Sequence, residues 1–171
     1  ERVALGIGGA FGWAAGTLLR IRWRTVLGHL RHAFPEKDEK WRRRLARASF
    51  RHLGRESVAT FRLSRMGVAE VRARTDMVGY EAMREVWSQG NGVIIATGHF
   101  GNWEMGGAAI VAHGIPCDAV VQAQRNPLFD ADLVAVRRRL EVGVIERKRA
   151  PREVLRSLRR GRSVGILGDQ N

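Results

Sequence analysis

The chain has 171 residues, and its 30 Lys or Arg against 17 Asp or Glu give a formal net charge of +13, which predicts a partner of negative charge. At 44% hydrophobic and 27% charged residues, the composition excludes a wholly disordered or collagen-like chain and predicts one domain, with or without an appendage. The single cysteine, Cys117, excludes an internal disulfide framework and a cysteine-rich zinc site, so we expect a buried apolar role for it.

The first predicted element is an apolar helix from Val3 to Leu19. At about 1.5 Å per residue it is roughly 25 Å long, just short of a bilayer core, which makes it a borderline membrane span. Glycines recur every four residues on one face, a spacing that allows close helix contact within a bilayer: Gly8, Gly12 and Gly16. Basic residues follow at once and predict a cytoplasmic C-terminal side: Arg20, Arg22 and Arg24. A cleaved signal peptide and a buried core helix are the alternatives, and membrane anchoring or interfacial binding is favoured.

A strongly basic helix is predicted next, from Trp41 to Arg65. Its arginines form either a solvated face or a surface that contacts anionic lipid. We therefore predict a membrane anchor helix with a basic flank at 1–24 and a helical, basic, membrane-proximal region at 25–75. The chain opens on Glu1 rather than Met, and it ends directly after an apolar run. It is interpreted as a C-terminally truncated fragment.

From residue 76 onward, apolar runs typical of strands alternate with helical patterns. Strands are predicted at 92–96, 119–123, 143–145 and 163–167, and helices at 103–113, 130–140 and 151–160. This alternation predicts an α/β domain at 76–171 with a parallel-rich mixed sheet flanked by helices.

The first strand leads directly into a cluster of polar residues. Ligands and catalytic groups gather at the carboxyl ends of strands in such sheets, so an active site is expected here. Asn102 is a good N-cap for the following helix, and Glu104 falls in the first turn of that helix. A carboxylate bound to one ring nitrogen of His99 would leave the other nitrogen free to take a proton from a hydroxyl. An ordinary capped histidine and a carboxylate that complements the helix dipole are the structural alternative.

The whole string has a family resemblance. Gly98-His99-Phe100-Gly101-Asn102-Trp103-Glu104 resembles the His-x4-Glu motif of the bacterial lipid A biosynthesis acyltransferases, the late lauroyl and myristoyl transferases, which are relatives of the glycerolipid acyltransferases. Other elements of that family follow in the same order: Ala33-Phe34-Pro35-Glu36, Gly92-Val93-Ile94-Ile95, Arg125-Asn126-Pro127-Leu128, Arg137 to Arg139 and Gly168-Asp169-Gln170. His29 stands where members commonly have Asn, and the family's chains continue beyond the Asp-Gln element.

This resemblance implies an O-acyltransferase with a glycerolipid-acyltransferase-like fold. His99 would be the general base and Glu104 its orienting carboxylate. Arg125 and Arg137 would bind phosphate on the acceptor or on the phosphopantetheine arm, and Asp169 would belong to the site.

Asn102 is counted with these as a substrate-binding candidate. The implied co-substrate is an acyl carrier protein thioester or acyl-CoA, with no metal and no further cofactor. The implied acceptor is a hydroxyl of a lipid A precursor. The expected partners are acyl carrier protein, the glycolipid and an anionic membrane surface, at the cytoplasmic face of the bacterial inner membrane.

Three alternatives stay open. The acceptor could be another glycolipid, such as a phosphatidylinositol mannoside, with acyl-CoA as the donor. A basic nucleic-acid-binding module fits the net charge, but the chain has no aromatic-interleaved RNA-binding strand motif and no recognisable helix-turn-helix. A non-catalytic membrane-associated scaffold would tolerate loss of His99.

Overall fold

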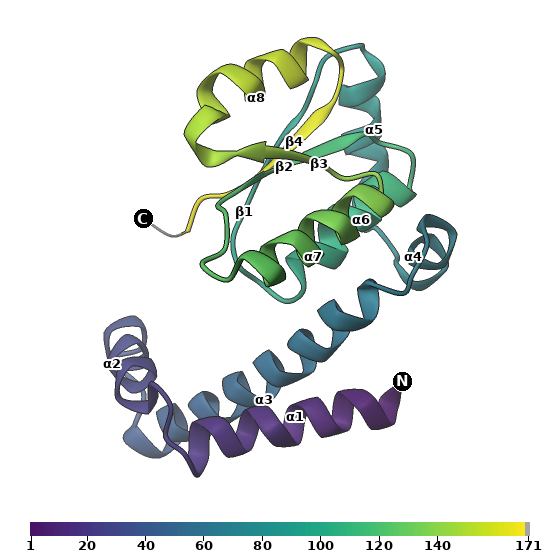
Figure 1. The fold of residues 1–171 in the computed structure, drawn as a ribbon. Coiled ribbons are helices and arrows are strands. Elements are labelled where there is room, and N and C mark those ends of the chain that lie inside the picture. The colour runs from purple at the N-terminus through teal and green to yellow at the C-terminus, as the bar shows by residue number, and fades with distance from the viewer. Residues whose placement is uncertain (170–171) are drawn as a thin grey trace. The chain divides into compact units, whose positions relative to one another are not determined.

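The structure is a computed structural model that describes residues 1–169, and its ribbon is drawn in Figure 1. The chain divides into two compact units, Glu1–Arg62 and Leu63–Asn171. The first unit is helical and contains α1 (Arg2–Thr17), α2 (Trp23–Ala33) and nearly all of α3 (Glu39–Leu63). The predicted apolar helix and the predicted basic helix are therefore confirmed as α1 and α3.

The glycine face of α1 packs directly against α3. Gly8 is buried, and a Cβ added to Gly12 would lie only 2.1 Å from the backbone oxygen of Phe50 on α3. Gly54 of α3 is equally close, because its own Cβ would lie 2.1 Å from the backbone oxygen of Gly8. The four-residue glycine spacing thus serves close helix packing within the protein. On the other side of α1, every fourth residue is an exposed apolar side chain: Val3, Ile7 and Phe11.

Among residues 1–169, no helix is long and apolar enough to cross a membrane.

This packing predicts opposite effects for two glycine substitutions in the same helix. Gly12→Ala should lower the free energy of unfolding by about 2 kcal/mol, because backbone atoms of α3 must move away from the new methyl group. Gly6→Ala meets no atom within 4 Å and should raise that free energy by about 1 kcal/mol through helix propensity. Urea unfolding followed by circular dichroism measures both, and effects of equal sign would contradict the packing.

The second unit begins with short helices and continues as a regular alternation. Its first helices are α4 (Val68–Arg74) and α5 (Tyr80–Ser88). The alternating elements are β1 (Ile94–Thr97), α6 (Trp103–Ala112), β2 (Cys117–Val121), α7 (Pro127–Arg139), β3 (Gly143–Glu146), the 3₁₀ turn η1 (Arg147–Arg149), α8 (Ala150–Arg159) and β4 (Ser163–Leu167). The predicted alternation of strands and helices is confirmed in order from β1 onward, although β2 begins two residues and α7 three residues before the predicted positions, and α5 was not predicted.

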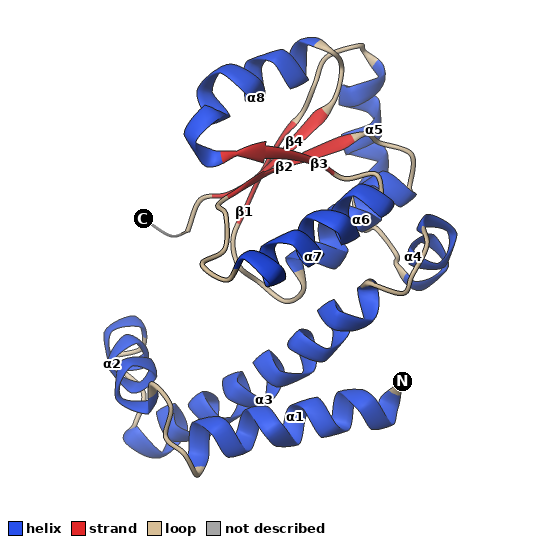
Figure 2. Cartoon of the chain, in the orientation of Figure 1, coloured by secondary structure: helices blue, strands red, loops and turns tan. Residues whose placement is uncertain are grey.

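The described strands form a four-stranded sheet in the order β1-β4-β2-β3, and every pairing in it is parallel. The α/β class is therefore confirmed, while the sheet is parallel throughout the described residues rather than mixed. Helices α6 and α7 cover one face and α8 covers the other, as Figure 2 shows. This arrangement follows from the connections, since the chain moves outward from β1 to β3 and then returns through α8 to insert β4 in the middle.

The core of the second unit lies between α4, α6 and the sheet. Its buried side chains are Leu63, Met66, Val71, Ala108, Ala109, Ala112, Leu140 and Val142. Cys117 is buried at the start of β2, and burial raises the pKa of its thiol to about 11. Its predicted role as a buried apolar side chain is confirmed, because such a thiol stays protonated at neutral pH.

A buried polar contact fixes α8 to the sheet. Asp118 of β2 accepts hydrogen bonds from Ser157 of α8 and from Arg162, whose Nε lies 3.0 Å from Oδ1. Burial alone would raise the pKa of Asp118, but the hydrogen bonds from Arg162 and Ser157 outweigh it and hold that pKa below its usual value. The carboxylate of Asp118 is therefore ionised and fully used by its neighbours.

Candidate active site

Two neighbouring strands end side by side at the same edge of the sheet. Thr97, the last residue of β1, is paired in register with Leu167, the last residue of β4. The pairing continues one step further, because the Gly168 N–H donates to the Thr97 carbonyl at 3.0 Å. His99 and Asp169 each follow two residues beyond the end of their strand, so the parallel sheet brings them to one place.

The two side chains form a close pair. Nδ1 of His99 lies 2.7 Å from Oδ1 of Asp169, and the His99 backbone N–H donates to Oδ2 at 2.9 Å. These bonds hold the pKa of Asp169 below its usual value, first through the His99 amide and then through the ring. The side chains are 31% and 39% exposed, so substrate can reach them. Trp103 meets the imidazole edge-on, with ring centroids 4.9 Å apart.

The glycines of the motif permit this geometry. A Cβ on Gly98 would lie 3.1 Å from the carboxyl carbon of Asp169 and closer still to the Phe100 ring, so both side chains would have to shift to make room for it. Gly101 has φ +54°, which favours glycine in the turn before α6. Asn102 then caps the helix, its side-chain oxygen accepting from the Met105 N–H at 3.0 Å. The predicted N-cap is confirmed.

Glu104 has a different partner from the one that the sequence predicted. Its carboxylate binds Arg137 of α7 through two hydrogen bonds, with Nε 2.9 Å from Oε2 and Nη2 bonded to Oε1. Both side chains are only 12% exposed. The predicted hydrogen bond between His99 and Glu104 is not found among the described side chains. The partners differ because the Arg137 guanidinium is a charged, bidentate hydrogen-bond donor for the Glu104 carboxylate. The pairing of β1 with β4 places Asp169 next to the imidazole instead.

The other predicted residues occupy distinct places. Arg125 is exposed and lies in the segment that connects β2 to α7. This segment leaves the sheet at the carboxyl edge. Arg137 spends Nε and Nη2 on Glu104, and its predicted contact with a phosphate stays a prediction. Gln170, the last residue of the Gly168-Asp169-Gln170 element, lies outside the described residues.

Sequence reasoning missed a set of exposed apolar side chains at this edge. Phe100 follows the histidine, Trp103 opens α6, and Leu128 stands at the start of α7, where the chain has just left β2. All three are exposed although their side chains are large and apolar. A signal was present in the sequence, because Phe100 and Trp103 belong to the Gly98–Glu104 string and Leu128 belongs to Arg125-Asn126-Pro127-Leu128.

The arrangement can perform proton transfer to or from a bound substrate. Asp169 orients the imidazole through Nδ1, and the described residues offer no hydrogen bond to Nε2. No Ser or Cys within residues 1–169 is bonded to the ring of His99, so the arrangement is a histidine held by a carboxylate, with no side-chain nucleophile bonded to it in this part of the chain. The described residues contain no group of three or more His, Cys, Asp or Glu positioned to hold a metal ion.

The fold and the site thus define an α/β domain in which an exposed histidine lies at the carboxyl edge of a parallel sheet. The family of bacterial lipid A biosynthesis acyltransferases matches the chain over residues 1–171, and the chain belongs to this family. The resemblance seen in the sequence is confirmed, and the protein is an acyltransferase of the lipid A type. A comparison with curated proteins gave no match.

Proposed function

We propose that the enzyme transfers a fatty acyl chain from an acyl carrier protein thioester to a hydroxyl of a lipid A precursor, with His99 as general base. Nε2 takes the proton of the hydroxyl while its oxygen attacks the thioester carbonyl. The ester C–O bond forms, the C–S bond breaks, and the imidazolium returns its proton to the departing sulfur. The observation that carries this proposal is the exposed His99 ring, bonded at Nδ1 to Asp169 and not bonded at Nε2 to a described residue.

Asp169 takes the orienting role in this mechanism. A carboxylate that accepts from Nδ1–H selects the tautomer with its lone pair on Nε2. Its negative charge also stabilises the imidazolium that forms when the hydroxyl is deprotonated. General-base action of this kind contributes roughly 10²- to 10⁴-fold in rate, and positioning of the two substrates supplies more.

The apolar side chains at the same edge fit a lipid substrate. Phe100, Trp103 and Leu128 give the carboxyl edge an apolar surface beside an ionised carboxylate. A fatty acyl chain gains about 0.8 kcal/mol for each methylene that it removes from water, so such a surface favours its binding there.

The proposed location is the cytoplasmic face of the bacterial inner membrane, with α1 lying in the lipid interface. The glycine face of α1 packs against α3, while the opposite stripe of Val3, Ile7 and Phe11 is exposed and apolar. Exposed arginines follow the helix: Arg20, Arg22 and Arg24. An apolar helix face next to basic residues is typical of interfacial helices, and each arginine gains about 1 kcal/mol near anionic lipid.

A direct assay tests the proposal. The full-length protein is incubated with a dodecanoyl carrier protein and a lipid A precursor held in anionic vesicles. We expect the glycolipid to gain the mass of one acyl group, with one carrier thiol released for each ester formed, and the enzyme to float with the vesicles. Thiol release without ester formation would show hydrolysis instead of transfer and would contradict the proposal.

A further inference from the structure

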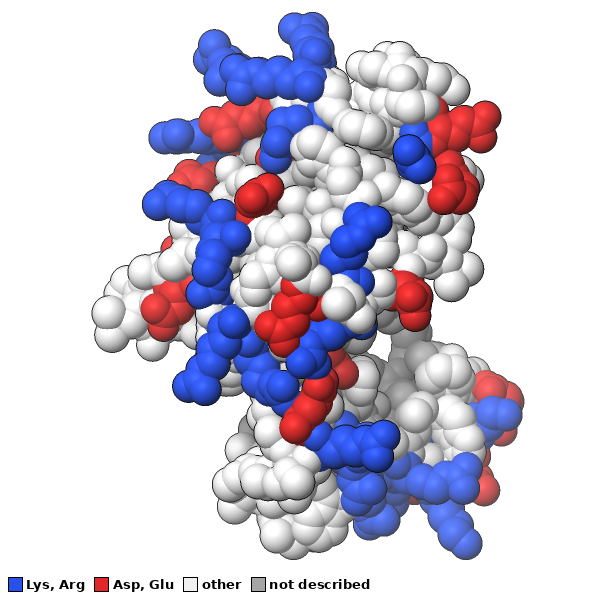
Figure 3. All heavy atoms as spheres, turned by 90° about the vertical axis from the view of Figure 1, so that its right-hand side faces the viewer, with Lys and Arg blue, Asp and Glu red and all other residues white. Residues whose placement is uncertain are grey.

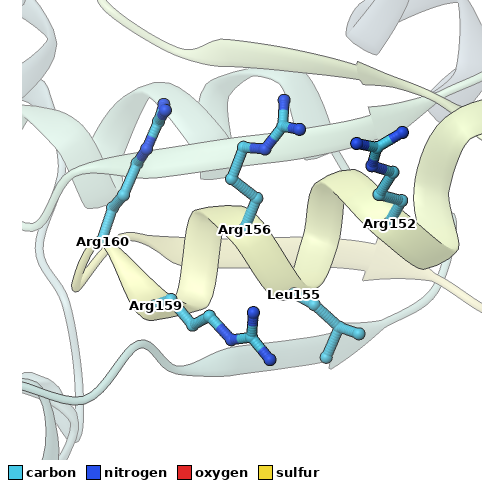
Figure 4. A pocket seen from close by; sticks show the side chains of 5 residues that line it. All are labelled: Arg152, Leu155, Arg156, Arg159 and Arg160. Carbon is cyan, nitrogen blue, oxygen red and sulfur yellow. The ribbon is translucent and has the colours of Figure 1, made fainter.

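Helix α8 carries a concentrated basic face. Four arginines lie on its exposed side, and with Leu155 they line a hollow of about 400 Å³: Arg152, Arg156, Arg159 and Arg160. Figure 4 shows two rows of side chains, with Arg152, Arg156 and Arg160 on one side of the helix and Leu155 and Arg159 on the other. The blue side chains at the top of Figure 3 show that basic groups gather at the level of α8.

The positive charge of this face has little counter-charge within the described part of the chain, where only Arg160 has an electrostatic interaction with an acid, Asp118, whose pKa it helps to lower. None of the four arginines has a hydrogen bond or an ion pair with any residue of 1–169. That acid is partly buried, and its hydrogen bonds are made with Arg162 and Ser157. Like charges one turn apart destabilise a helix by a few tenths of a kcal/mol per pair, roughly 0.2–0.5. A helix that keeps four of them together is therefore suited to a partner that supplies negative charge.

The shape of the face selects among negative partners. Arg152, Arg156 and Arg160 follow the four-residue spacing of a helix ridge, and Leu155 and Arg159 form the neighbouring ridge. The groove between two such ridges accepts a ridge of another helix. Leu155 is 56% exposed and gives the groove one apolar contact. One leucine is too little apolar surface for insertion into a bilayer, and α8 has no aromatic side chain on which a nucleic-acid base could stack.

The position of α8 relates this face to the candidate active site. Through η1, the helix follows the carboxyl end of β3, and in a parallel sheet that end lies at the same edge as the ends of β1 and β4. Arg152 is in the first turn of α8 and so lies toward the edge where His99 is found. A protein bound along α8 is therefore held next to the site.

We propose that this basic face of α8 docks an acidic helix of a protein partner and, resting on the proposed function, that this partner is the protein that carries the acyl thioester. The carrier's acidic side chains would pair with the arginines, and an apolar residue between them would contact Leu155. The face would then determine which donors the enzyme accepts, without touching the reacting atoms.

The test compares two charge reversals in the full-length protein. Arg156→Glu with Arg159→Glu changes the α8 face, and Arg65→Glu with Arg84→Glu makes the same change in net charge at exposed positions outside α8. Binding of dodecanoyl carrier protein is measured by fluorescence anisotropy. Acyl transfer is measured from that carrier and, separately, from dodecanoyl pantetheine, which has no protein part.

We expect the α8 variant to bind the carrier about tenfold more weakly or worse, while the control pair keeps the parent affinity. In the α8 variant, the rate of transfer from the carrier should fall by the same factor as carrier binding. Its rate of transfer from dodecanoyl pantetheine should stay at the parent value. The parent affinity should also weaken as salt rises. Arg156→Gln with Arg159→Gln, checked by thermal unfolding, gives an intermediate loss and guards against a folding defect.

Several results would overturn the docking proposal. Parent-like carrier binding by the α8 variant would do so, as would an equal loss in the control pair. Loss of binding to anionic phosphatidylglycerol vesicles with carrier binding intact would assign the face to the membrane instead. Absence of transfer from both donors in the parent protein would contradict the proposed function alone, because the binding comparison decides the docking surface by itself.

Discussion

Replacing His99 by alanine is expected to lower the rate of acyl transfer by roughly 10²- to 10⁴-fold, because the acceptor hydroxyl loses its general base. The free energy of unfolding should change little, since the side chain is partly exposed and its contacts with Trp103 and Asp169 lie at the surface. The turnover number with saturating donor and acceptor measures the effect. His32→Ala, at an exposed position on α2, is the matched control and should keep parent turnover.

Asp169→Asn separates the orienting role from the base. The amide oxygen can still accept from the His99 amide, but the negative charge that stabilises the imidazolium is lost. We expect turnover to fall by roughly 10²-fold or more. Because the pKa of Asp169 lies below its usual value, its carboxylate is ionised at and above neutral pH, so the loss should be the same across that range. Asp132→Asn on α7, also exposed, is the control, and parent turnover in Asp169→Asn would remove Asp169 from the mechanism.

The sequence predicted the order of elements well, because their patterns are local. The strand predicted at 163–167 agrees with β4 at both ends. Helix α5 was not predicted, and contacts far along the chain hold it. Tyr80 donates to the carbonyl of His113, and Trp87 donates to the carbonyl of Gly161 at 2.7 Å. These partners lie 33 and 74 residues away, beyond the range of any periodic pattern.

The candidate site also has a local part that the sequence predicted and a long-range part that it did not. The turn that presents His99 is local, so its position and the capping role of Asn102 were predicted. The partner of the imidazole depends on which strand lies next to β1, and Asp169 is 70 residues away. A clue was available, because β1 and β4 are each followed by glycine and then by a titratable residue. The glycines of α1 show a related limit, since their spacing predicts close helix contact but not whether lipid or protein surrounds it.

The ion pair between Glu104 and Arg137 gives a large expected effect on stability, and its substitution shows what Glu104 does. Glu104→Gln leaves a mostly buried guanidinium without its counter-charge and should lower the free energy of unfolding by about 2 kcal/mol. Adding Arg137→Met removes the unpaired charge and should recover more than half of that loss. Thermal and urea unfolding measure this cycle, with Glu85→Gln at an exposed position of α5 as the control.

Activity measured on the same variants separates the two roles of this carboxylate. If Glu104 only ties α6 to α7, turnover recovers together with stability in the double variant, because Asp169 still orients His99. If Glu104 orients the imidazole during catalysis, its substitution lowers turnover by more than the lost stability explains, and Arg137→Met does not restore it. The structure favours the first outcome, since both oxygens of Glu104 are bonded to Arg137 and Nδ1 of His99 is bonded to Asp169.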